Sequence, residues 1–146
     1  MEERRGARIG TVSGLALLAG GTAVAAVAGG AHSIFATVLL GLLTAGLGHA
    51  LGVEIQRQAR RGSAGGWARE DTINAVLLGS WAEFALITAL IFTHSWPVRA
   101  VGLGLALTYG GCCAYFVTTR RRTVAAARAA AVSAAADTTE ALPRLR

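Results

Sequence analysis

The hydrophobic residues of this chain lie in long uncharged runs separated by short basic segments. Residues 9–53 contain no Asp, Glu, Lys or Arg, and this run is 45 residues long. A helix needs about 20 apolar residues to cross the ~30 Å hydrocarbon layer of a membrane, so the run is long enough for two crossings and a turn. Glycine and polar residues at 29–33 interrupt it near the middle and mark that turn. We therefore predict a transmembrane helical hairpin over residues 9–53.

The second half of the chain shows a similar pattern. Residues 72–94 carry a single charge, Glu83, and residues 100–119 carry none. Pro97 lies between the two runs, where it ends one helix or begins the next. This pattern predicts a second transmembrane hairpin over residues 72–119.

The predicted fold is an all-α integral membrane protein with four transmembrane helices in two hairpins. The remaining segments are an N-terminus at 1–8, a loop at 54–71 and a basic tail at 120–146. A soluble helical bundle would need polar outer faces, which residues 9–53 do not supply. A further alternative is a cleaved signal peptide, because Ala-Val-Ala at 26–28 is typical of a cleavage site. The first apolar run is, however, longer than the roughly 7–15 residues usual for such peptides.

The charged residues predict the orientation of these spans. All 14 basic residues are Arg, against 8 acidic residues, which leaves a net charge of +6. Every Arg except Arg99 lies in the N-terminus, the central loop or the tail. Because cytoplasmic segments carry the excess of basic residues, we predict that both termini and the central loop are cytoplasmic. The predicted basic cytoplasmic surface contains Arg57, Arg60, Arg61, Arg120, Arg121 and Arg122.

Orientation alone accounts for these Arg residues, and membrane lipids are the partner that the sequence predicts for them. A basic side chain near anionic headgroups contributes about 1 kcal/mol to membrane binding. Direct contact with DNA is not required to explain the basic segments. We therefore expect a multi-pass protein of the cell membrane.

Small residues recur at four-residue intervals in the predicted spans. The pairs are Gly10 with Gly14 in the first span and Gly48 with Gly52 in the second. This spacing places both residues on one helix face and lets two backbones approach closely, which favours helix pairing in lipid. It predicts specific helix packing and a homo-oligomer. The alternative is that an Ala- and Gly-rich sequence produces such spacings by chance.

Glu83 is the one charged residue near the middle of a predicted span. An ionisable side chain at this depth is costly and is a candidate functional group by default. One hypothesis is a proton- or cation-responsive site that faces the interior of the bundle. The alternative is a neutral acid that is hydrogen-bonded within the bundle, with Ser80 or His49 as its partner.

No motif in the sequence indicates an active site. A phosphate-binding loop, a nucleophile elbow and a catalytic dyad are all missing from the sequence. Cys112 and Cys113 are adjacent rather than in a Cys-x-x-Cys spacing, and we interpret them as buried apolar thiols. We therefore expect a non-enzymatic protein with no cofactor and no metal.

The composition also suggests a family. Exclusive use of Arg, together with abundant Ala, Gly and Val, indicates a GC-rich coding sequence of the kind found in actinomycetes. With its small size, several spans and basic ends, the chain resembles the small hydrophobic spread proteins of Streptomyces conjugative plasmids. That resemblance implies a membrane component of conjugative plasmid transfer and intramycelial spread, partnered with other plasmid transfer proteins. The alternatives are a small proton-coupled transporter or channel that uses Glu83 and a phage holin-like protein.

Overall fold

A computed structural model describes residues 2–28, 34–61, 66–92 and 95–141 of the chain. These residues are almost entirely helical, and the described part of the chain contains no strand, which confirms the all-α prediction. The elements are α1 (Glu2–Ala28), α2 (Ile34–Ala59), α3 (Arg69–Ile87), the π-helix η1 (Thr88–Phe92) and α4 (Trp96–Ala141). The turn predicted at residues 29–33 lies outside the described residues.

Four of the described helical segments are long and apolar enough to cross a membrane. They are Gly10–Ala28, Ile34–Ala59, Arg69–Ile91 and Trp96–Ala136. Their apolar side chains mostly point outward: Ile34 is 83% exposed, and Phe35 and Leu42 on the same helix are also largely exposed. A soluble bundle would bury such residues, so this outer surface fits a multi-pass membrane protein.

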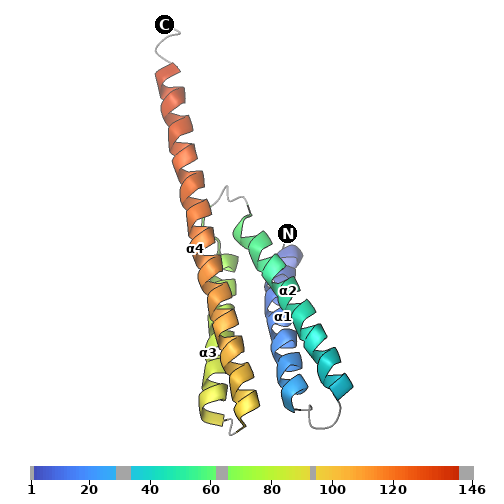
Figure 1. The fold of residues 1–146 in the computed structure, drawn as a ribbon. Coiled ribbons are helices and arrows are strands. Elements are labelled where there is room, and N and C mark those ends of the chain that lie inside the picture. Colours follow the sequence, from blue (N-terminus) through green and yellow to red (C-terminus); the bar gives the residue numbers. More distant parts are fainter. Residues whose placement is uncertain (1, 29–33, 62–65, 93–94, 142–146) are drawn as a thin grey trace.

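The helices lie side by side in two pairs, α1 with α2 and α3 with α4 (Figure 1). The pairs meet where α1 contacts both α3 and α4, and where α2 contacts α4. A core of apolar residues from all four helices fills this meeting place. Its fully buried members are Val12, Ala16, Leu51, Ile55, Ala59, Leu78, Tyr109 and Phe116.

Helices α2, α3 and α4 continue beyond the predicted spans, into the segments predicted as the central loop and the tail. Helix α2 continues to Ala59 and α3 begins at Arg69, so much of the predicted loop 54–71 is helical. Helix α4 has 46 residues and continues through much of the predicted tail, beyond the ends of the other helices (Figure 1). Alanine is the best helix former, and the Ala-rich tail therefore extends the last span as one helix.

The glycines that were predicted to pack helices are not the ones that do so within this chain. A Cβ atom added at Gly10, Gly14, Gly48 or Gly52 would meet nothing within 4 Å, so no neighbouring helix requires glycine there. The close approach is at Gly102, where a Cβ would lie 2.7 Å from Ala89 Cβ. Glycine at position 102 therefore lets α4 pack closely against Ala89 of η1 and the end of α3.

Candidate functional site

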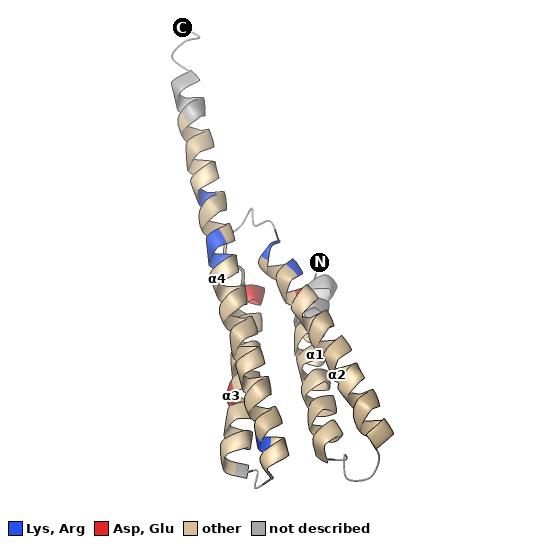
Figure 2. Ribbon diagram, in the orientation of Figure 1, with Lys and Arg blue, Asp and Glu red and all other residues tan. Residues whose placement is uncertain are grey.

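Polar side chains from three helices gather at one end of the helix pairs. We call this cluster the polar junction; it contains Glu54, Gln58, Arg61, Glu70, Asp71, Asn74 and Arg120. It joins the end of α2 to the start of α3 and to the middle of α4. Figure 2 shows charged residues of α2, α3 and α4 concentrated at this end of the molecule.

Arg120 and Asp71 form the centre of the polar junction. Arg120 Nε donates to Asp71 Oδ2 at 2.9 Å, and both side chains are under 5% exposed. The same carboxylate oxygen accepts the backbone N–H of Ala68 at 3.0 Å, which caps the first turn of α3. Arg120 Nη1 donates to the carbonyl oxygen of Arg61 just beyond α2. One guanidinium group therefore ties α4 to both α3 and the end of α2.

A chain of hydrogen bonds continues the polar junction between α2 and α3. Asn74 Nδ2 donates to Gln58 Oε1 at 2.7 Å, and Gln58 Nε2 donates to Glu54 Oε1 at 2.7 Å. Asn74 and Gln58 are both buried. Because buried amides are costly when unpaired, these contacts favour one register between the two helix pairs.

The prediction of a basic surface is wrong for one of its six residues, Arg120. Arg120 is 1% exposed and belongs to the polar junction, not to the surface. Its charge is neutralised by Asp71, which the fold brings in from another helix. Arg61 is half-buried and lies 3.7 Å from Glu70. The other predicted residues do lie on the surface, namely Arg57, Arg60, Arg121 and Arg122.

The predicted intramembrane site is not assembled inside the chain. Glu83, Ser80 and His49 are all exposed on the outer surface of the helices. Among the described residues, Glu83 makes no hydrogen bond or ion pair with Ser80 or His49, nor with any other group. The expectation that Glu83 faces the interior of the bundle is therefore wrong for the single chain. The reason is its position on α3: it lies far around the helix from the buried Leu78.

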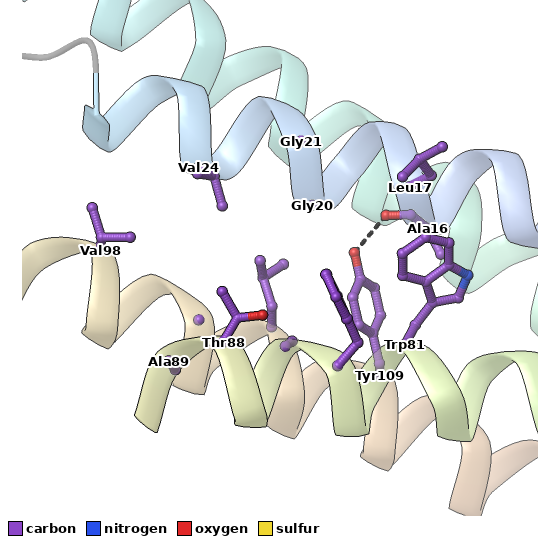
Figure 3. A pocket seen from close by; sticks show the side chains of 14 residues that line it. Ala16, Leu17, Gly20, Gly21, Val24, Trp81, Thr88, Ala89, Val98 and Tyr109 are labelled. Carbon is purple, nitrogen blue, oxygen red and sulfur yellow. Dashed lines mark hydrogen bonds between the residues drawn. The ribbon is translucent and has the colours of Figure 1, made fainter. Parts of the chain in front are cut away.

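An apolar cavity of about 400 Å³ lies between α1 and the α3–α4 pair (Figure 3). It exists because small residues line all three helices, namely Ala16, Gly20, Gly21, Ala85, Ala89 and Gly102. Larger side chains complete the lining, among them Trp81, Phe84 and Leu105. Sequence reasoning missed this cavity, because it depends on which small residues face each other across helices.

The polar groups that line the cavity are already engaged within the protein. Tyr109 donates its hydroxyl hydrogen to the carbonyl oxygen of Ala16, as Figure 3 shows. Trp81 Nε1 donates to Ser13 Oγ at 3.2 Å. Thr88 also interacts with another group of the protein. The cavity therefore suits a hydrocarbon group, because a polar ligand would lose its hydration without gaining hydrogen bonds.

Comparisons with protein-family models, with curated proteins and with solved structures found no match to this chain. Among the described residues, no group of three His, Cys, Asp or Glu side chains is placed to hold a metal ion. The features that the fold does assemble are the polar junction, the cavity and the long basic helix α4.

Proposed function

We propose that the chain is a non-enzymatic, multi-pass protein of the cell membrane, with two transmembrane hairpins and with both termini in the cytoplasm. The four apolar helices support the crossings, and the distribution of Arg supports the orientation. In this placement the polar junction lies at the cytoplasmic ends of the spans. Its ion pair is then near the aqueous interface, where a charged pair is less costly than in the hydrocarbon layer.

We further propose that this protein serves conjugative plasmid transfer and intramycelial spread, as a membrane anchor for other transfer proteins. Beside the resemblance in size, spans and composition, one observation supports an anchoring role. Helix α4 continues without a break from its apolar segment to Ala141, and it extends beyond the other helices (Figure 1). We call residues 123–141 of this helix the arm. Because the arm is continuous with a span, a protein bound to it is held at a defined place on the membrane.

The base of the arm also carries a surface that suits a protein partner. An open groove there is lined by Trp67 from the segment before α3 and by Arg121, Arg128 and Val132 from α4. An aromatic residue and Arg side chains are the residue types enriched where proteins bind one another.

A spread assay tests this proposal. The gene is deleted from a plasmid that spreads from a donor colony, and it is then supplied as the full chain or as a variant that ends at Ala125. We expect the deletion to shrink the zone of spread, the full chain to restore it, and the shortened chain to fail although it still reaches the membrane. An unchanged zone in the deletion strain would exclude the role in spread.

Two further measurements separate the alternatives. Lysis of cells on overproduction would favour a holin-like protein. Proton-linked flux in liposomes that is lost in Glu83→Gln would favour a transporter or channel. Either result, together with an unchanged zone of spread, would replace the proposal.

A further inference from the structure

Glu83 lies on a face of α3 that is exposed and that the described part of the chain does not cover. The exposed residues of this face are spaced alternately four and three apart, and we call them the outer seam: Val76, Ser80, Glu83, Ile87 and Leu90. Leu78, Ala89 and the other buried residues of α3 and η1 lie on the opposite side. Alternate spacing by four and three is the pattern with which one helix packs along another.

The depth of Glu83 makes an uncovered outer seam costly in a membrane. Glu83 is within one helical turn of the middle of the 23-residue apolar segment Arg69–Ile91. Most of the seam is apolar, namely Val76, Ile87 and Leu90, and no described residue of the same chain forms a hydrogen bond or ion pair with the Glu83 carboxyl group. Lipid tails offer no hydrogen bonds, so a carboxyl group that faces them is unsatisfied.

We propose that the outer seam binds the outer seam of a second copy of this chain, and that the Glu83 carboxyl groups of the two copies hydrogen-bond to each other. Two copies inserted in the same orientation are related by a two-fold axis along the membrane normal, so each seam position faces its own counterpart. A pair of carboxyl groups that shares a proton contains both a donor and an acceptor. The seam is therefore self-complementary at its one ionisable position.

The rest of the outer seam fits the same partner. Val76, Ile87 and Leu90 supply apolar contacts above and below Glu83, and Ser80 supplies a small polar neighbour one turn away. A buried ionisable position within a mostly apolar seam fixes the register of a helix pair, because a shifted register leaves its carboxyl groups unpaired. Interhelical hydrogen bonds in membranes contribute measurable stability.

The inference rests on the membrane placement in the proposed function, and not on plasmid spread. A chain that stays out of the membrane fraction would contradict the proposed function. A chain that inserts but remains monomeric would contradict only the dimer.

Disulfide cross-linking in native membranes tests the contact. In a cysteine-free chain (Cys112→Ala with Cys113→Ala), one cysteine is introduced in the seam by Ile87→Cys. The matched control is Leu42→Cys, an exposed position on α2. We expect a cross-linked dimer of the chain for Ile87→Cys and none for Leu42→Cys. A monomer only, a cross-link to another protein, or equal cross-linking at both positions would overturn the proposal.

Self-association in lipid vesicles tests the role of Glu83 itself, measured by energy transfer between donor- and acceptor-labelled chains. Glu83→Leu removes the hydrogen bond between the two copies. We therefore expect the dissociation constant of the dimer to rise by roughly three- to tenfold. Glu83→Gln keeps a neutral group that both donates and accepts, so its dimer should persist. Because Glu83 makes no hydrogen bond or ion pair with the described residues of its own chain, neither variant removes such an interaction from the fold. Equal association of the wild-type chain and Glu83→Leu would overturn the proposal.

Discussion

Asp71 and Arg120, 49 positions apart in the sequence, form a buried ion pair at 2.9 Å that joins the start of α3 to the middle of α4. The pair does not stand alone, because Asp71 also accepts the N–H of Ala68 and Arg120 also donates to the carbonyl of Arg61. These additional hydrogen bonds help to offset the cost of burying two charges, because a buried ion pair is tolerated only when further hydrogen bonds support it.

Breaking the pair should destabilise the fold strongly. Arg120→Met leaves the Asp71 carboxylate buried without its cation, and we expect the free energy of unfolding to fall by about 3–5 kcal/mol. The measurement is unfolding in detergent micelles, followed by circular dichroism as SDS is added.

The neighbouring arginines provide the control for this prediction. Arg121 is exposed, so Arg121→Met should change stability by no more than about 0.5 kcal/mol. The double variant Asp71→Leu with Arg120→Met removes both charges, and it should recover most of the loss. Equal effects of Arg120→Met and Arg121→Met would show that the buried pair does not stabilise the fold.

The contrast between Arg120 and its neighbours also shows which features of the fold the sequence alone does not predict. The apolar helices could be predicted, because the length of an uncharged run is a property of the run itself. Arg120, Arg121 and Arg122 are equivalent in sequence, and only the fold shows that one of them meets Asp71. The same limit applies to Glu83, whose place near the middle of a long apolar helix could be predicted while the direction it faces could not.

Gly102 should be intolerant of a side chain. A Cβ atom there would lie 2.7 Å from Ala89 Cβ and 3.4 Å from the carbonyl oxygen of Ala85, so α3 and α4 would have to separate. We expect Gly102→Ala to cost about 1–3 kcal/mol, the usual range for an overpacked core. Gly104→Ala is the control, since a Cβ at Gly104 meets nothing within 4 Å. Similar unfolding curves for the two variants would contradict the close approach of these helices.

Gly102 also shows why the spacing of small residues did not predict the close helix contact within this chain. A four-residue interval indicates that two small residues lie on the same helix face, but it does not indicate whether that face contacts a neighbouring helix. Among the described residues, a Cβ at Gly10 or Gly14 would meet nothing within 4 Å, whereas a Cβ at Gly102 would meet Ala89. The pattern therefore predicted a property of a helix surface and not a contact.

The hydroxyl of Tyr109 should stabilise the contact between the two helix pairs. It donates to the carbonyl oxygen of Ala16, and it fits there because a Cβ at Gly20 would lie 2.9 Å from the phenol oxygen. We expect Tyr109→Phe to lower the free energy of unfolding by about 0.5–1.5 kcal/mol. Tyr115 is exposed, so Tyr115→Phe should have no measurable effect. If both variants unfold like the wild-type chain, this hydrogen bond does not contribute to stability.

Trp81 should report whether a lipid chain enters the apolar cavity. Its indole ring lines the cavity, and replacing the exposed Trp67 and Trp96 by Phe leaves it as the only tryptophan. Phospholipids with brominated acyl chains quench tryptophan fluorescence on contact. Gly21 also lines the cavity, and a Cβ there meets nothing within 4 Å, so Gly21→Leu places a larger apolar side chain at the cavity.

We expect Gly21→Leu to reduce the quenching of Trp81, because the leucine occupies the volume that an acyl chain would otherwise fill. Gly41→Leu places the same side chain at an open position on α2 that does not line the cavity, and it should leave the quenching unchanged. Circular dichroism of both variants would show that the helices persist. Equal quenching in the two variants would mean that lipid reaches Trp81 only from outside, and that the cavity does not hold an acyl chain.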